Sequence, residues 1–209
     1  MLEEKLKEKK RYLIVKRFFD IVLSAIGLLI LLIPLIIIAI IIKLDSEGPV
    51  IFKQVRIGKG EVPFNIYKFR TMVVCQDKNS SLVTRTKDKR ITKVGAFLRK
   101  AKLDEFPQLF NVLLGDMSIV GPRPEVSKYV AYYTKEEKKV FLVRPGITDL
   151  ASIEYRNEQD ILENSNDPEK TYIEEIMKEK LKLNQKYIEN MSFLFDLKLI
   201  FKTFAAILN

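Results

Sequence analysis

Two adjacent carboxylates, Asp104 and Glu105, are the residues whose type and position best suit chemistry. They follow three cations and come directly before an apolar segment. A carboxylate can act as a nucleophile, or it can bind a hard metal ion. The simpler interpretation, and the commoner one for such a segment, is that both acids only complement backbone N–H groups at a helix start, with Pro107 in the first turn.

Two further clusters contain cations suited to phosphate. The segment 121–125, Gly-Pro-Arg-Pro-Glu, holds Arg123 between two prolines, which favours bidentate phosphate binding, although this Arg could instead pair with a neighbouring acid. Alternation along an extended segment would place Lys68 and Arg70 on one face, as a phosphate clamp or as a solvated edge. Carboxylates and cations together supply what polyphosphate chemistry requires.

The composition narrows the chemistry further. Lys and Arg number 36 against 27 Asp and Glu, a net charge of +9 that suits nucleic acid, anionic lipid or a phosphorylated small molecule. The sequence contains no His and a single Cys, Cys75, which excludes disulfide frameworks, zinc sites and His-based acid–base catalysis. Any metal would therefore be Mg²⁺, or Mn²⁺ as the alternative, bound by acidic oxygens and substrate phosphates.

A long apolar segment precedes all of these residues. The 22 residues 21–42 carry no charge and as a helix would reach about 33 Å, enough for a hydrocarbon layer of ~30 Å. Pro34 within them predicts a kink or break. Both flanks are basic, which by the positive-inside bias places both ends in the cytoplasm. A re-entrant hairpin broken at Pro34 satisfies both observations, and a single kinked spanning helix is the alternative.

The remaining pattern divides the chain into a membrane element, residues 1–47, and a catalytic domain, residues 48–209. Residues 2–20 predict a charged amphipathic helix, and Gly48-Pro49 ends the hydrophobic element. Segments 50–55 and 62–67, joined by Gly-Lys-Gly, predict a β-hairpin. Apolar spacing then predicts the following elements: helices over 94–100, 104–114 and 125–142, an extended piece over 147–155, and a charged solvent-facing helix over 168–190.

Two segments allow alternatives. The polar residues 75–92 favour a linker, with a lid as the other possibility. Residues 192–208 are rich in Phe, Leu and Ile, and predict either an amphipathic interfacial helix or one packed on the core. The predicted fold class is α+β and predominantly helical. It comprises the re-entrant membrane hairpin, a compact cytoplasmic catalytic domain with a small sheet, and the C-terminal interfacial helix.

The sequence resembles the bacterial sugar transferase family, the small monotopic phosphoglycosyl transferases, over nearly its whole length. Five blocks in the family's order carry the resemblance. They are KRFFD at 16–20, KFRTM at 68–72, LDEFPQLFNV at 103–112, GDMSIVGPRP at 115–124 and RPGIT at 144–148.

The resemblance implies a two-step reaction. Asp104 would attack the β-phosphate of a UDP-sugar, expel UMP and hold a covalent phosphosugar, which polyprenyl (undecaprenyl) phosphate then accepts. Glu105 would bind Mg²⁺ together with Asp104, or order the site. Five cations become candidates for the phosphates or the uridine: Lys68, Arg70, Arg99, Arg123 and Arg144.

The resemblance also implies a location and partners. The re-entrant helix broken at Pro34 would keep the active site level with the lipid headgroups, on the cytoplasmic face of the bacterial plasma membrane. The partners would be the UDP-sugar, the polyprenyl phosphate and the lipid bilayer, without nucleic acid, and a homodimer is compatible with the sequence. The product would enter glycoconjugate synthesis, as in polysaccharide and exopolysaccharide assembly.

The sequence departs from the family pattern at three places. Ile33 stands where a Ser often precedes the proline, Asp149 stands where Gly is common, and residues 154–157 read Glu-Tyr-Arg-Asn in place of Asn-Gly-Arg-Asn. The departures at Asp149 and at residues 154–157 leave the identity of the transferred sugar open. Two non-catalytic hypotheses compete with the enzyme: a membrane-tethered nucleic-acid binder using the basic stretch 85–99, which predicts strong salt dependence, and a scaffold binding anionic lipid without UMP release. The ordered blocks favour the enzyme.

Overall fold

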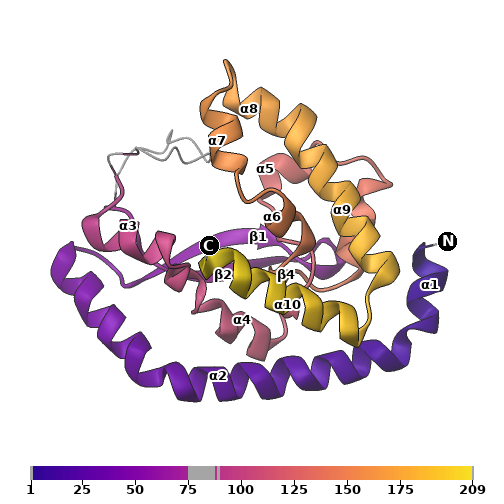
Figure 1. Ribbon diagram of the computed structural model, residues 1–209, viewed down its shortest axis with the longest axis horizontal. Helices are drawn as coiled ribbons and strands as arrows, with labels where there is room; N and C mark the ends of the chain where they lie inside the picture. The colour runs from indigo at the N-terminus through magenta and orange to yellow at the C-terminus, as the bar shows by residue number, and fades with distance from the viewer. Residues whose placement is uncertain (1, 75–87, 89, 209) are drawn as a thin grey trace.

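The computed structural model describes residues 2–74, 88 and 90–208 (Figure 1). Most of the polar segment 75–92, with Cys75, therefore lies outside the described residues. The described chain is mostly helical, with a two-stranded hairpin and one short parallel strand pair. This agrees with the predicted helical α+β class.

The N-terminal helices are α1 (Leu2–Glu8) and α2 (Lys10–Asp45), as expected for residues 2–20 and the apolar segment. Of the kink or break predicted at Pro34, the break does not occur, because α2 runs through this residue as one continuous helix of 36 residues. Proline removes one backbone donor and crowds the carbonyl one turn earlier, which bends a long helix without ending it. Figure 1 shows α2 bending in its second half.

Both ends of α2 are attached to the body of the protein. Near its start, Arg17 donates hydrogen bonds to the carbonyls of Val112 (2.7 Å) and Leu113 (3.1 Å). One turn on, the buried carboxylate of Asp20 accepts from the Ser118 hydroxyl at 2.8 Å. At its end, the guanidinium of Arg70 binds main-chain carbonyls from residues 42, 46 and 47. The apolar residues between these anchors include many exposed side chains, such as Leu29, Ile30 and Ile33.

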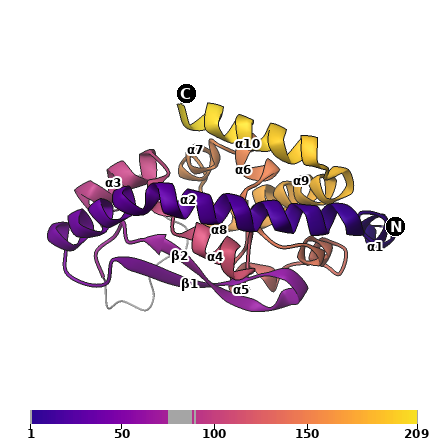
Figure 2. The same cartoon turned by 90° about the horizontal axis from the view of Figure 1, so that it is seen from below.

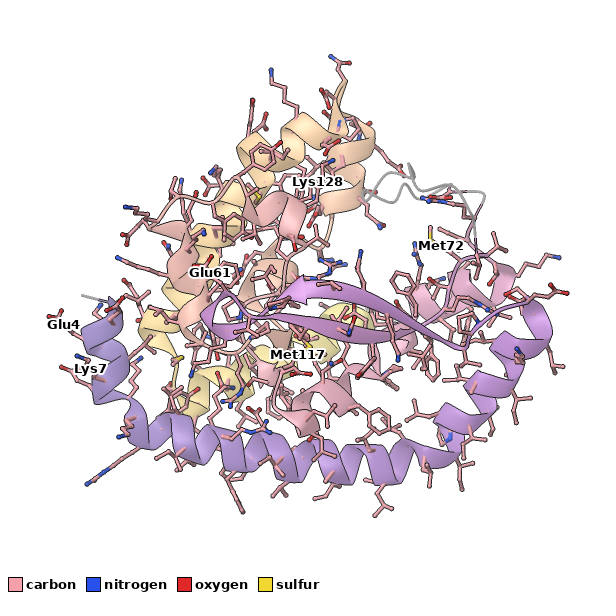
Figure 3. The ribbon with its side chains drawn as sticks, turned by 180° about the vertical axis from the view of Figure 1, so that it is seen from behind. Glu4, Lys7, Glu61, Met72, Met117 and Lys128 are labelled. Carbon is pink, nitrogen blue, oxygen red and sulfur yellow. The ribbon has the colours of Figure 1, made fainter. Side chains whose placement is uncertain are left out.

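The predicted hairpin is confirmed as strands β1 (Ile51–Ile57) and β2 (Pro63–Phe69), paired antiparallel with Ile51 opposite Phe69. Its turn is η1 (Lys59–Glu61), in which Gly60 adopts φ 69°, a conformation that glycine adopts at little cost. Figure 3 shows the hairpin in front, with Glu61 at its turn and Met72 beyond its other end.

A second, parallel pair joins β3 (Ser118–Val120) to β4 (Gly146–Thr148). The strand pair requires two glycines, because a Cβ on Gly121 would lie 2.5 Å from the Arg144 carbonyl, and one on Gly146 would lie 2.1 Å from the Gly121 nitrogen. The extended piece predicted over 147–155 is therefore only partly correct. It ends at Thr148, because the side chain of Asp149 caps helix α6 (Leu150–Glu154).

The helices agree with the sequence pattern in part. Helix α3 (Lys93–Lys100) is confirmed. The helix predicted over 104–114 is divided into η2 (Leu103–Glu105) and α4 (Gln108–Leu114). The helix predicted over 125–142 is wrong. Only α5 (Ser127–Val130) and η3 (Glu137–Leu142) form there, because the two apolar groups reach the core from separate short turns.

The C-terminal third carries the largest core. It contains α7 (Glu158–Glu163), α8 (Pro168–Thr171), η4 (Tyr172–Ile176), α9 (Met177–Asn190) and α10 (Phe193–Leu208). The helix expected over 168–190 is not purely solvent-facing, since Met177, Leu181 and Ile188 are buried in this core. Seen from below, α2 runs the length of the molecule between α10 and the hairpin (Figure 2).

Candidate active site

The carboxylates Asp104 and Glu105 lie in the short turn η2, between α3 and α4. The residue before this turn, Lys102, adopts a left-handed conformation with φ 56°, which is strained for a residue with a Cβ. Local backbone strain of this kind concentrates at functional sites. The turn leaves the Asp104 side chain largely buried, and both acids line the principal cavity of the protein.

Glu105 is the common partner of two cations from different parts of the chain. Lys68 Nζ, from β2, and Arg123 Nη2, from the loop after β3, each lie 2.7 Å from Glu105 Oε1. The adjacent helix α4 is fixed to β2 by Asn111, whose side chain accepts from the Tyr67 N–H and donates to the Asn65 carbonyl. The fold therefore brings four of the residues singled out from the sequence, Asp104, Glu105, Lys68 and Arg123, into one group.

Burial and neighbouring charges shift the pKa values of the two carboxylates in opposite directions. Burial raises the pKa of Asp104 above its ordinary value, while the Lys68 ammonium opposes this rise. Burial also acts to raise the pKa of Glu105, but Arg123 and Lys68 outweigh it and hold that pKa well below its usual range. At neutral pH, Glu105 is thus a fixed anion holding two cations, and Asp104 is a largely desolvated carboxyl group beside them.

Arg99 reaches the same cavity from the end of α3. Its Nε donates to the Thr71 hydroxyl at 2.8 Å. Burial lowers its pKa, and the negative charge of Asp104 acts against this shift. In the basic stretch 85–99, Arg90 pairs with Asp88 at 2.6 Å, while residues 85–87 and 89 lie outside the described part of the chain. The described arginines of this stretch are therefore engaged within the protein.

Arg70 and Arg144 bind main-chain oxygens instead of joining this group. Arg70 lines the cavity but is only 5% exposed, and its terminal nitrogens bind the end of α2. Arg144 does not line the cavity, and its Nε donates to the Gly115 carbonyl, past the end of α4, at 2.7 Å. Their predicted contacts with phosphate or uridine stay predictions, and both arginines have a clear structural role.

The principal cavity is an open trough of about 2210 Å³ between the hairpin, η2 and the C-terminal helices. Sequence reasoning missed part of its wall. Arg56 of β1 binds the Glu125 carboxylate at 3.2 Å, and the Tyr172 hydroxyl donates to the other oxygen of that carboxylate. Burial lowers the pKa of Arg56 and raises that of Tyr172. No local pattern links these residues, which are 69 and 47 positions from Glu125.

The acidic side chains of the cavity show how the expected Mg²⁺ could be bound. Sites that transfer phosphate groups hold Mg²⁺ with one or two carboxylates and with substrate oxygens. Asp104 can supply one carboxylate, whereas Glu105 Oε1 is already bound by Lys68 and Arg123. Among the described residues, no group of three or more acidic, His or Cys side chains forms a metal cage. These residues therefore fit an Mg²⁺ ion whose other ligands would be oxygens of the substrate.

Comparison with known proteins adds an independent finding. A family model described as "bacterial sugar transferase" matches residues 11–209. A UDP-glucose:undecaprenyl-phosphate glucose-1-phosphate transferase of Klebsiella pneumoniae is 40% identical over 195 residues, which cover 91% of this chain and 39% of the relative. A UDP-N-acetylgalactosamine-undecaprenyl-phosphate N-acetylgalactosaminephosphotransferase of Aeromonas hydrophila is 36% identical over 94% of this chain and 44% of the relative.

A shorter relative matches over most of its own length. The sugar transferase EpsL of Bacillus subtilis is 38% identical over 197 residues, which cover 94% of this chain and 88% of EpsL. The chain spans less than half of the length of the Klebsiella and Aeromonas relatives. Each of the three matches covers more than nine tenths of this chain.

Proposed function

The chain belongs to the bacterial sugar transferase family, and on this premise we propose that it transfers a sugar 1-phosphate from a UDP-sugar to polyprenyl phosphate, with release of UMP. The observation that carries the proposal is the group in the cavity wall: Asp104 lies next to Glu105, which holds Lys68 and Arg123 at 2.7 Å each. This arrangement combines a nucleophile with fixed positive charge, as phosphoryl transfer requires.

In the first step, an Asp104 carboxylate oxygen attacks the phosphorus of the β-phosphate. A new bond forms between this oxygen and the phosphorus, and the bond from the β-phosphorus to the bridging oxygen breaks, so that UMP leaves with the bonding electrons. Lys68 and Arg123 offset the repulsion between the carboxylate and the diphosphate. The raised pKa of Asp104 reflects a carboxylate that burial has stripped of water, which favours attack once the proton is lost.

In the second step, an oxygen of polyprenyl phosphate attacks the phosphorus held on Asp104. The bond between phosphorus and Asp104 breaks, which restores the carboxylate and gives polyprenyl-diphosphate-sugar. Dividing one difficult transfer into two steps is the usual advantage of a covalent route. When bound, Mg²⁺ would neutralise charge on the phosphate oxygens, with Asp104 as its protein ligand.

We also propose that α2 enters the membrane without crossing it, with the active site at the cytoplasmic face. Among the described helices, α2 is the one long and apolar enough to span a bilayer. A crossing would separate its two ends by the thickness of the membrane, whereas Asp20 and Ile42 are both held by the same body. Exposed apolar residues on the neighbouring helices support immersion of this side: Leu114, Leu194, Phe201 and Phe204.

UMP release from a panel of UDP-sugars tests the reaction, with detergent-solubilised protein, Mg²⁺ and polyprenyl phosphate. Asp104→Asn should reduce UMP release to background, while Asp160→Asn, the same change at an exposed position of α7, should leave it unaltered. Without acceptor, wild-type protein should release about one UMP per chain in a burst. UMP release that persists in Asp104→Asn would contradict the covalent route.

A further inference from the structure

Two buried oxygen atoms near Arg123 have no hydrogen-bond partner in the described part of the chain. They are Asp149 Oδ2 and Asn184 Oδ1, on residues that are 2% and 5% exposed. Both residues line the principal cavity. A buried acceptor without a partner costs on the order of 1–3 kcal/mol, so two of them in one cavity wall call for a ligand that supplies donors.

The fold places both residues next to Arg123. The Gly121 N–H donates to the Thr148 carbonyl at 3.0 Å, which joins the segment before Arg123 to the residue before Asp149. Asn184, from α9, lines with Arg123 a smaller cavity of about 20 Å³. Arg123 itself binds Glu105, the neighbour of Asp104. Asp149, Asn184 and Arg123 therefore line the same cavity as the reacting carboxylate of Asp104.

The two oxygens of the Asp149 carboxylate differ in their hydrogen bonding. Its Oδ1 accepts from the Ser152 N–H at 2.7 Å and caps α6, which leaves Oδ2 unused by the fold. Asn would serve equally well as a cap. Capping alone therefore does not require a carboxylate here, although its charge also acts on Arg123, whose pKa is raised by Glu105 and, more weakly, by Asp149.

We propose that Asp149 and Asn184 form the sugar-recognition subsite, where they accept hydrogen bonds from hydroxyl or amide N–H groups of the sugar ring. The inference rests on the proposed function. It selects neutral hexoses and N-acetylhexosamines as the donor class, because both sugars present hydroxyl donors. A uronic acid would place a second carboxylate near Asp149, where like charges repel. Sites built to hydrogen-bond a substrate reject analogues that cannot supply the donor.

The test compares donors that differ only at carbon 6: UDP-glucose with UDP-glucuronic acid, and UDP-galactose with UDP-galacturonic acid. Wild-type kcat/KM should favour the neutral member of each pair. Asp149→Asn should lower kcat/KM for the neutral donor by about 10-fold to 100-fold and narrow its advantage over the uronic acid. Asn184→Asp, which keeps an acceptor and adds charge, should widen that advantage. Asp167→Asn is the matched control, since Asp167 caps α8 in the same way outside the cavity.

The possible failures are distinguishable. A wild-type preference for the uronic acids would overturn the inference and leave the proposed function intact. An equal loss with every donor in Asp149→Asn would also overturn it, because the residue would then act only on Arg123 or on folding, and a thermal melt of the variant separates these two causes. Absence of UMP release from wild-type protein with every donor would contradict the proposed function itself, and the inference with it.

Discussion

Lys68 Nζ lies 2.7 Å from Glu105 Oε1, and this contact joins the end of the hairpin to the turn that carries Asp104. The two side chains are 19% and 14% exposed, so solvent screens the pair only in part. Arg123 binds the same oxygen. Glu105 therefore acts first as the residue that positions two cations, and the metal-binding role expected from the sequence would have to use its remaining oxygen.

Glu105→Gln should destabilise the protein and weaken substrate binding together. Removing one partner of a buried ion pair leaves the other charges uncompensated, at a cost of about 3 kcal/mol. The melting temperature in detergent should fall, and KM for the UDP-sugar should rise. Glu136→Gln, which breaks the exposed pair with Lys139, should change neither. A Glu105→Gln protein as stable as wild type would show that Glu105 does not hold these cations.

Glu105 should also make stability depend on acid pH. Its folded-state pKa lies below the ordinary value of 4.5, so the unfolded chain binds the proton more tightly. The stabilisation is then fully present above pH 4.5 and is lost as pH falls through the folded pKa. Melts between pH 6 and pH 3 should show the first part of this loss in wild type, because pH 3 lies between the unfolded and the folded pKa, and a smaller loss in Glu105→Gln. Identical slopes for both proteins would refute the assignment.

Protonation of Asp104 should determine how kcat/KM for UMP release falls at acid pH. Burial raises its pKa above the ordinary 3.8, and attack on phosphorus needs the deprotonated carboxylate. The pH profile of kcat/KM for UMP release should therefore rise with pH through a midpoint above 3.8. A midpoint at or below 3.8, measured where the protein is still folded, would contradict it.

Arg70→Lys should affect stability more than catalysis. The guanidinium donates to the carbonyls of Ser46 at 2.6 Å and Glu47 at 2.9 Å, and a Lys ammonium cannot reproduce this planar fork. The melting temperature should fall while KM for the UDP-sugar stays near its wild-type value. Arg123→Lys is the contrasting variant, and it should raise KM. A large increase of KM in Arg70→Lys with an unchanged melt would restore the substrate-binding role expected from the sequence.

The sequence predicted the hairpin and the helix near 94–100, but several other helix bounds and the contacts between distant parts of the chain were not predicted. The hairpin follows from strand segments around a Gly-Lys-Gly turn, and Lys68, Arg99, Arg123, Asp104 and Glu105 do gather at one cavity. The prediction of one helix over 125–142 was wrong, because the spacing of apolar residues does not show where a turn of the backbone interrupts a helix. Tyr129 and Phe141 reach the same core from separate short helices.

The roles of the arginines also depend on long-range contacts that the sequence does not show. Sequence alone could not separate Arg70, which binds the end of α2, from Arg123, which binds Glu105. Both are cations in conspicuous motifs, and only the tertiary contacts distinguish them. The unpaired oxygens of Asp149 and Asn184 were equally invisible, although Asp149 stood out as a departure from the family pattern.

The last prediction concerns the two ends of α2. In a Cys75→Ser background, which removes the chain's single cysteine, Lys10→Cys and Asp45→Cys place one thiol at each exposed end of the helix. A membrane-impermeant maleimide should label neither thiol in intact bacterial cells and both after permeabilisation, because each end stays beside the body that holds Asp20 and Ile42. Labelling of one end in intact cells would show that α2 crosses the membrane.

Pro34→Leu restores the missing backbone donor and should straighten the helix. The variant should therefore shift the protein towards the form that crosses the membrane. If both thiols in this variant still react only after permeabilisation, the contacts that hold the two ends of α2 outweigh the bend.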